Sequence, residues 1–344
     1  IADLQTLKDP MAEKILPRLS EEEMQTYIET ELTEASKILP ANYKKGDKNY
    51  GRFTAGLAHT VLLKLYMLTK QWDKAEAEGR ELMKPEYGFE LVPEYKDIFT
   101  LANEKNPEII WACQCAKGYQ EHKWQPHVLP NDYNFTPYLD KMTKWNGYKI
   151  SWSFMHTFDP EDKRLLTIAS EYTSKDGVVH NEKNDSQDPS AQLYLGAVPL
   201  KYEFDPDCTG EDSQIDWIIY RYADVLTLTA EAIVRNKNAV TKEAVDLLNE
   251  VRTRSLPGKG YSLQDLNSVD KFLKAVLDER GWELYFEGNR RQDLIRYGIF
   301  VETIKKKAQS MGKQTLVDEN RHRFPIPQSI IDEGKGVIEQ NPGY

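Results

Sequence analysis

The side chains best suited to chemistry are large aromatic rings that alternate with hydrogen-bonding groups. Six Trp and Tyr residues lie between positions 124 and 152: Trp124, Tyr133, Tyr138, Trp145, Tyr148 and Trp152. The polar residues beside them are His122, Gln125, His127, Asn131, Asp132 and Asn146. A sugar ring has an apolar C–H face that stacks on an aromatic plane and a rim of hydroxyls that bonds amides and carboxylates. The mixture predicts a carbohydrate site.

The same rings have a second use, because in a segment without regular helices they would also build a satellite core. We predict that the cluster as a whole contains a glycan site. The rings that stack on sugars are then Trp124, Trp145, Tyr148 and Trp152. The partners of the sugar hydroxyls are Asn131, Asp132, Asn146 and Arg164.

Two cysteines and two histidines raise the alternative of a zinc site. Cys113 and Cys115 precede His122 and His127, and residues two apart on a strand face the same side. Structural zinc sites usually separate paired cysteines by two to four residues, and cysteines on a buried strand more often serve as small apolar side chains. Acidic loops elsewhere would suit calcium but lack the EF-hand pattern. We expect no cofactor, and no motif supports calcium.

Three glutamates four residues apart raise the alternative of a glycosidase. Glycoside hydrolysis needs two carboxyl groups on opposite sides of a bond, about 5 to 9 Å apart. Glu279, Glu283 and Glu287 instead line one helix face, and the nearby cations predict salt bridges with Arg280, Arg290 and Arg291. The chain also lacks a Gly-rich phosphate loop, a G-x-S-x-G elbow and an H-E-x-x-H motif. We therefore predict that the protein is not an enzyme.

Helical hairpins are predicted on both sides of the aromatic segment. A capping box at Ser20 begins a helix that runs to about Leu39. Apolar residues at helical spacing predict one hairpin over 54–82 and a second over 222–251, followed by a helix over 269–286. Small residues at close-packing positions suit pairs of the tetratricopeptide type, although the strict 34-residue consensus is absent.

The segment between the hairpins loses the helical period and fills with Pro, Gly, Asn and aromatic residues. Short strands are predicted over 107–113 and 178–180. The end of the chain predicts helices ending at Gly288 and Gly298, then an extended tail punctuated by prolines. The predicted fold is mostly α, with tetratricopeptide-like hairpins and a large, irregular, loop-rich insertion. We expect a single domain over 1–344, with parts at 1–85, 86–216 and 217–344.

The composition of the chain argues against several classes of partner and structure. The net charge of −10 argues against a nucleic-acid groove, which needs concentrated Lys and Arg. No run of eighteen apolar residues occurs that would span a membrane as a helix. Three cysteines are too few for a disulfide framework.

Motifs along nearly the whole chain resemble the SusD/RagB family, and they come in the family's order. Gly51-Arg52-Phe53-Thr54 with Trp72 to Ala75 resembles its hairpin. The helices from Arg221 to Ala232 and from Leu248 to Arg252 resemble its "R.aevlL..AEA" and "LN.vR.R" segments. The remaining matches lie at 27–40, 106–110, 159–164, 279–298, 324–327 and 340–344.

The resemblance implies a non-catalytic surface protein that binds oligo- or polysaccharide and delivers it to a SusC-like TonB-dependent transporter. It implies a place on the extracellular face of the outer membrane, held only by a lipid anchor on an upstream cysteine outside this sequence. Family members carry two further N-terminal hairpins, so we expect a truncated chain. The alternative function is a helical-repeat scaffold that binds proteins and no glycan.

Overall fold

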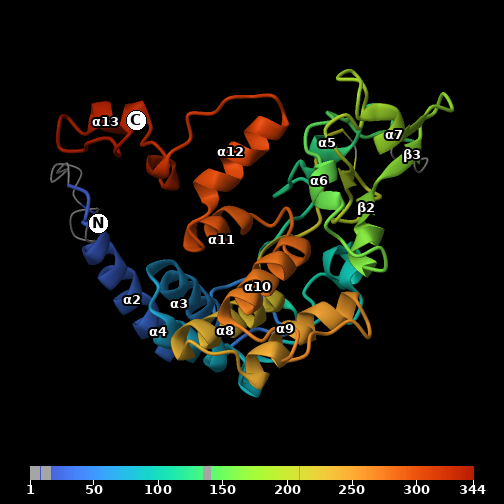
Figure 1. Ribbon diagram of the computed structural model, residues 1–344. Coiled ribbons are helices and arrows are strands. Elements are labelled where there is room, and N and C mark those ends of the chain that lie inside the picture. Colours follow the sequence, from blue (N-terminus) through green and yellow to red (C-terminus); the bar gives the residue numbers. More distant parts are fainter. Residues whose placement is uncertain (1–7, 9–16, 135–140, 209) are drawn as a thin grey trace.

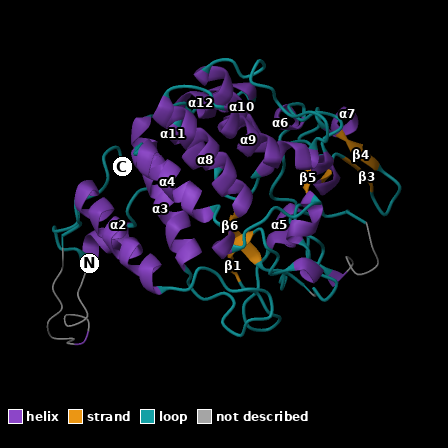
Figure 2. Ribbon diagram, turned by 90° about the horizontal axis from the view of Figure 1, so that it is seen from below, coloured by secondary structure: helices purple, strands orange, loops and turns teal. Residues whose placement is uncertain are grey.

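The computed structural model describes Lys8 and residues 17–134, 141–208 and 210–344 (Figure 1). Helices dominate these residues, and their strands form three small two-stranded sheets. The helices gather on one side of the molecule, and the loop-rich insertion with most of the strands lies on the other (Figure 2). The predicted fold class is confirmed. No helix in the described ranges is both long and apolar enough to cross a membrane.

The first long helix begins where its capping residues predict. Helix α2 covers Glu21–Ile38, and Ser20 Oγ accepts a hydrogen bond from the Glu23 N–H at 3.1 Å. The Ser20 N–H donates in return to Glu23 Oε2 at 2.8 Å. This reciprocal pair satisfies donors that the first turn of a helix leaves free.

Both predicted hairpins are present. Helices α3 (Ala55–Thr69) and α4 (Trp72–Leu82) form the first. Helices α8 (Tyr222–Lys237) and α9 (Lys242–Ser255) form the second, which turns at Asn238 in the left-handed conformation with φ 48°. Asparagine tolerates this conformation better than most residues, so the chain reverses there without glycine.

The two hairpins pack together through α4 and α8. Gly79 lies so close to α8 that a Cβ atom there would stand 2.0 Å from Thr229 Oγ1. A glycine is therefore needed for this close approach. Helix α10 (Val269–Glu283) packs against α8 and extends the layer, as its apolar spacing predicts.

The C-terminal region differs from the prediction. Helix α11 (Arg290–Arg296) precedes Gly298, as expected. The following tail was predicted as extended, but it contains α12 (Phe300–Ser310) and α13 (Gln328–Glu333). The prolines on which that prediction depends begin only at residue 325, and nothing before them breaks a helix over 300–310.

The strands join the insertion to the hairpins. The predicted strands at 107–113 and 178–180 correspond to β1 (Ile109–Cys113) and β4 (Val179–Asn181). Strand β1 (Ile109–Cys113) pairs antiparallel with β6 (Trp217–Arg221), which leads directly into α8. The smaller pairs are β2 (Ile168–Ala169) with β5 (Val198–Pro199), and β3 (Glu171–Thr173) with β4 (Val179–Asn181).

Two apolar clusters form the core. The first lies among α3, α4, α8, α9 and α10 and is mainly aliphatic. The second lies in the insertion and contains many rings, including the fully buried Tyr133. Its members include Ile218 of β6 and Tyr285, which follows α10. The insertion thus has its own ring-rich core, and the end of α10 reaches into it.

Candidate functional site

A pocket of about 590 Å³ lies beside the short helix α5 (Trp124–Val128). We call it the aromatic pocket. It is lined by Cys113, Cys115, Gln120, His122, Lys123, Trp124, His127, Tyr148, Trp217 and Phe286. These residues come from β1, the following loop, α5, the loop before α6 (Trp152–Met155), β6 and the segment after α10. The site therefore assembles from parts of the chain that are far apart in sequence.

A buried indole anchors the rings of the pocket. The Trp124 side chain is only 6% exposed. Its ring centroid lies 5.5 Å from that of Trp217 and 5.3 Å from that of Phe286, edge-on to the latter. Tyr148 stacks at 6.3 Å with an angle of 27° between the planes. Aromatic pairs at these separations stabilise one another, so the walls are held by mutual packing.

Two rings at this site remain exposed. Tyr148 is 47% exposed and Trp145 is 39% exposed. His127 lies between them, stacked on Tyr148 at 5.0 Å and edge-on to Trp145 at 4.7 Å. The two exposed rings are therefore inclined to each other. Exposed rings next to a pocket offer a stacking surface to a ligand.

Backbone hydrogen bonds hold the exposed rings against α5. The Trp145 N–H donates to the Pro126 carbonyl at 2.8 Å. The N–H groups of Gly147 and Tyr148 both donate to the His127 carbonyl at 2.8 Å. These bonds place the loop over 145–148 directly on the short helix. The orientation of Tyr148 is thus set by the backbone as well as by ring packing.

The polar residues predicted at the site lie in a neighbouring group. Asn146 donates through Nδ2 to the Gln192 carbonyl at 3.2 Å, and the Asn131 N–H donates to Gln192 Oε1 at 3.4 Å. Asp132 accepts from the Tyr172 hydroxyl at 2.6 Å and lies 3.0 Å from His180 Nε2. A sugar hydroxyl at Asp132 would have to compete with these two partners.

Two other predicted residues lie away from the aromatic pocket. Trp152, in α6 (Trp152–Met155), is partly buried against the insertion core and donates to the Leu193 carbonyl at 3.1 Å. Arg164 has no exposed surface. Its guanidinium is held by Asp162, Glu279 and Glu283 at 2.6 to 3.2 Å. Its predicted bond to a sugar hydroxyl does not fit this position, because every neighbour is a buried carboxylate. Tyr138 lies outside the described residues.

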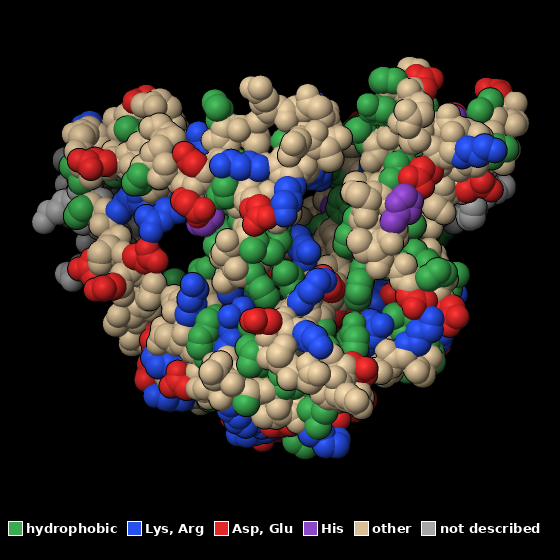
Figure 3. All heavy atoms as spheres, in the orientation of Figure 1, with side chains coloured by type: hydrophobic (Ala, Val, Ile, Leu, Met, Phe, Trp, Pro, Cys, Tyr) green, Lys and Arg blue, Asp and Glu red, His purple; other side chains and the backbone are tan. Residues whose placement is uncertain are grey.

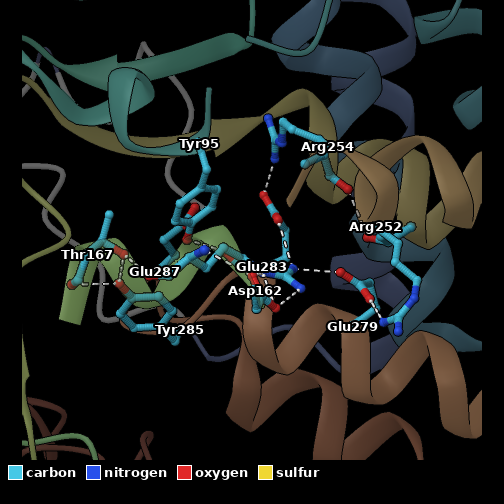
Figure 4. A network of polar contacts seen from close by, with 12 residues as sticks. Tyr95, Asp162, Thr167, Arg252, Arg254, Glu279, Glu283, Tyr285 and Glu287 are labelled. Atoms are coloured by element: carbon cyan, nitrogen blue, oxygen red, sulfur yellow. Dashed lines mark hydrogen bonds and ion pairs between the residues drawn. The ribbon is translucent and has the colours of Figure 1, made fainter. Parts of the chain in front are cut away.

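Arg164 is one of several buried cations that pair with Glu279, Glu283 and Glu287 in a buried ion network. Figure 4 shows the network around Glu279 and Glu283. The network confirms that Glu279, Glu283 and Glu287 form salt bridges. Their partners, however, are not the predicted neighbours Arg280, Arg290 and Arg291. They are Arg164, Lys201, Arg221, Arg252 and Arg254, which come from the insertion, β6 and α9. Long-range contacts of this kind cannot be read from helical spacing.

Two members of the network, Glu283 and Lys201, have shifted pKa values. Burial by itself would raise the pKa of Glu283, but Arg254, Arg221 and Arg164 hold it well below its usual range. Burial lowers the pKa of the Lys201 ammonium to about 8, although Glu287 opposes the shift. The Glu283 carboxylate is thus ionised, and its oxygens are paired with arginines.

The aromatic pocket itself carries little charge. Burial raises the pKa of the Cys115 thiol to about 11, so this thiol is neutral at pH 7. Burial also lowers the pKa of His122, whose Nε2 lies 2.8 Å from the Ile215 carbonyl. Lys123 is the only Lys or Arg in the lining, and Glu211 pairs with it at 2.6 Å. No group of three or more potential metal ligands gathers anywhere in the described part of the chain.

Sequence reasoning missed Trp217 and Phe286. Trp217 begins β6, and the apolar run over 217–220 was available as a strand signal. Phe286 lies in the segment 279–298, whose motif resembles the SusD/RagB family but indicates no ligand contact. No local pattern indicates that this ring meets Trp124, because their contact depends on how α10 packs against the insertion.

A second hollow of about 1180 Å³ lies between α2, α3 and the C-terminal tail (Figure 3, left of the view). Its described lining is aliphatic and polar and includes no Phe, Tyr or Trp. It therefore lacks the stacking surface that distinguishes the aromatic pocket, although it is larger.

Comparisons with known proteins agree with the fold and the motifs. The model of the SusD family matches residues 202–344. SusD-like protein P25 of Formosa agariphila is 25% identical, with 96% of this chain and 66% of that protein covered. The starch-binding protein SusD of Bacteroides thetaiotaomicron is 25% identical, with 94% and 65% covered. The chain thus spans slightly less than two thirds of the length of these relatives.

A solved structure shows the same fold. Surface glycan-binding protein A of Bacteroides thetaiotaomicron, in complex with laminarihexaose, superposes with a TM-score of 0.72 at 20% identity. The superposition covers 94% of this chain and 72% of that one. The family model, relatives that cover nearly the whole chain and a shared fold agree: residues 202–344 match the SusD family, and the chain shares the fold of this solved structure.

Proposed function

We propose that this protein binds an oligo- or polysaccharide at the aromatic pocket without cleaving it. The observation that carries the proposal is the half-exposed Tyr148 ring, which stands at the pocket beside Trp124, Trp217 and Phe286. A pyranose ring stacked on Tyr148 would use the exposed aromatic face and leave its hydroxyl rim for polar neighbours. Two similar proteins, the starch-binding protein SusD and the surface glycan-binding protein in complex with laminarihexaose, support this class of ligand.

Binding without catalysis suits the lining of the pocket. None of the residues that line it within the described ranges is Asp or Glu, whereas glycoside hydrolysis needs two carboxyl groups around the bond. The glutamates of α10 are buried and paired with arginines, so they have no access to a substrate. Prolonged incubation with a polysaccharide should release no reducing ends.

The affinity should be modest. A few stacked rings contribute roughly 0.5 to 1.5 kcal/mol each before the cost of association is subtracted. We therefore expect a Kd no tighter than about 1 μM for a short oligosaccharide. Such binding would suit a protein that captures a glycan and passes it on.

The match of residues 202–344 to the SusD family supports a wider role. We propose that the protein works on the extracellular face of the outer membrane, held by a lipid anchor that lies outside this sequence. There it would deliver glycan to a SusC-like TonB-dependent transporter. Co-purification of a transporter without any measurable glycan binding would instead favour the scaffold function.

Affinity gel electrophoresis on a panel of polysaccharides that includes soluble starch and laminarin tests the proposal. Wild type should be retarded on at least one gel, and Tyr148→Ala should run as on a blank gel. A matched control is Tyr27→Ala in α2, because Tyr27 is 40% exposed and does not line the pocket. Equal retardation of Tyr148→Ala and wild type would place the site elsewhere, and no retardation on any gel would exclude glycan binding to the panel.

A further inference from the structure

Phe286 has an unusual backbone conformation. Its φ is 57°, in the left-handed region. The other described non-glycine residues with positive φ are Lys70, Lys105, Asn146, Asn238 and Lys335, so Phe286 is the only aromatic among them. Bulky residues rarely adopt this region, and such strain persists only where the surrounding structure imposes it.

Contacts on both sides of Phe286 impose the conformation. The Tyr285 hydroxyl lies 2.6 Å from Thr167 Oγ1, and Figure 4 shows the Tyr285 ring directed at Thr167. The Tyr285 carbonyl accepts from Lys201 Nζ at 2.8 Å. On the other side, Glu287 accepts from Arg221 Nε and Nη2, both at 2.7 Å. Because both neighbours are anchored to distant elements, the backbone between them cannot relax.

The strained backbone presents the Phe286 ring to the aromatic pocket. The ring is partly exposed and lines the pocket. Its centroid lies 5.3 Å from Trp124 and 6.2 Å from Tyr148. Tyr285, one residue earlier, is buried in the insertion core instead. Because Phe286 is left-handed, two successive rings lie in different places: Tyr285 packs in the insertion core, and Phe286 lines the pocket.

We propose that Phe286 is a wall of the glycan site that determines affinity, and that Glu287 is a positioning residue that holds it there through Arg221 and Lys201. The proposal rests on the glycan-binding function argued above. Residues in strained conformations cluster at functional sites, where the strain places a group for use. The C-terminal family segment would then contribute directly to ligand binding as well as to the scaffold.

A series at position 286 tests the wall. Isothermal titration with laminarihexaose and maltohexaose, on full-length chain, should give Phe286→Gly an affinity about tenfold weaker than wild type. Phe286→Tyr keeps an aromatic ring and should stay within about threefold, while Phe286→Leu keeps only an apolar group and should resemble Phe286→Gly. Unchanged affinity in Phe286→Gly would overturn the proposal.

Thermal unfolding separates a binding role from a structural one. Glycine adopts positive φ without strain, so Phe286→Gly should unfold within a few degrees of wild type despite the lost ring. The control Asn238→Gly replaces another left-handed residue by glycine, at a position that does not line the aromatic pocket. The affinity of this variant for the hexasaccharides should equal that of wild type. A large fall in Tm of Phe286→Gly with unchanged affinity would show that the ring serves only packing.

A double-mutant cycle tests the positioning role of Glu287. Glu287→Gln keeps the size of the side chain but weakens its ion pairs, so affinity should fall about threefold or more while Phe286 is still present. In the Phe286→Gly background the same change should have almost no further effect on affinity. Independent, multiplying losses would show that Glu287 does not act through Phe286.

The Tyr148→Ala variant distinguishes failure of this inference from failure of the proposed function. If Tyr148→Ala loses affinity and Phe286→Gly does not, the pocket binds glycan but Phe286 is no part of it. If neither variant changes the affinity, the site lies elsewhere and both proposals fall. If wild type binds neither hexasaccharide but is retarded on a polysaccharide gel, the variants are compared on that gel, where equal retardation of Phe286→Gly and wild type overturns the inference. If wild type is retarded on no gel, both proposals fall.

Discussion

At the scale of single residues, the exposed fraction of a side chain distinguishes the roles of aromatic rings that lie close together in the sequence. Trp124 and Tyr148 both lie in the aromatic insertion, yet one is 6% and the other 47% exposed. Trp124 therefore holds the walls together, and Tyr148 offers a face to a ligand. The same principle separates Arg164 from Asn131, since only the latter reaches solvent.

The thiol of Cys115 provides a residue-scale prediction. Burial raises its pKa to about 11, and only the thiolate reacts with alkylating reagents. Below pH 11 the thiolate fraction, and therefore the rate of alkylation by iodoacetamide, should rise about tenfold for each pH unit. The measurement uses a Cys113→Ser, Cys208→Ser double variant, so that Cys115 is the single cysteine.

Ligand protection extends the same measurement. Because Cys115 lines the aromatic pocket, a saturating glycan should slow its alkylation without changing the rate for glutathione in the same solution. A rate that levels off near pH 9, as for an ordinary thiol, would contradict the burial of Cys115.

At the scale of elements, the fold depends on a few close approaches between helices. The α4–α8 contact is the clearest, because the backbone of Gly79 meets the side chain of Thr229. Helices that approach this closely need a small residue on one side. The antiparallel hairpins therefore stack as a layer, on which α10 is placed so that its end reaches the insertion core.

Gly79→Ala should destabilise the protein by about 1 to 3 kcal/mol through overpacking. Helix propensity predicts the opposite sign, since alanine favours an exposed helix by about 1 kcal/mol over glycine. Urea unfolding measures the difference. Thr229→Ala removes Oγ1 and Cγ2, two of the three Thr229 atoms that the new methyl group meets, so it should recover part of the loss in the double variant. Stabilisation by Gly79→Ala alone would show that the helices separate easily.

At the scale of the whole molecule, the buried ion network ties together the parts of the chain that build the site. Glu283 of α10 contacts Arg164 of the insertion, Arg221 at the end of β6 and Arg254 of α9. Glu108, just before β1, joins through Arg221 and Arg254. The hairpins and the insertion therefore share one set of charges, and the position of Phe286 depends on it.

Loss of Glu283 should affect the whole molecule. Glu283→Gln leaves buried arginines without their shared carboxylate, and breaking a buried pair costs about 3 to 5 kcal/mol. Urea unfolding monitored by circular dichroism checks this. Glu302→Gln is a matched control, because Glu302 is an exposed glutamate with a single lysine partner in α12.

The same residue predicts the direction of acid sensitivity. The folded-state pKa of Glu283 is depressed, so its contribution to stability is present above the unfolded-state pKa of about 4.3. It is lost as pH falls through the lower pKa of the folded state. The free energy of unfolding of wild type should therefore drop from pH 5 to pH 3 more steeply than that of Glu283→Gln. Equal slopes would show that Glu283 is not held by its arginines.

The helices could be predicted because their signals are local. The capping box at Ser20, the apolar spacing of α3 and α8, and the turn residue Asn238 act within a few residues of themselves. The aromatic cluster was also visible, and Tyr148 within it lies at the pocket. Helix α12 was missed because the extended conformation that the prolines from residue 325 onward indicate was predicted for the whole segment after Gly298.

The sequence by itself determined the helical hairpins, the resemblance to the SusD family and the region in which to look for a site. Only the tertiary structure decided which residues meet there. Arg164 follows several acidic residues in the sequence, yet it pairs with Glu279 of α10, more than a hundred residues away. Trp217 and Phe286 join Trp124 because a β-pairing and a buried ion network bring them together. Such contacts depend on burial and long-range packing, which no local spacing encodes.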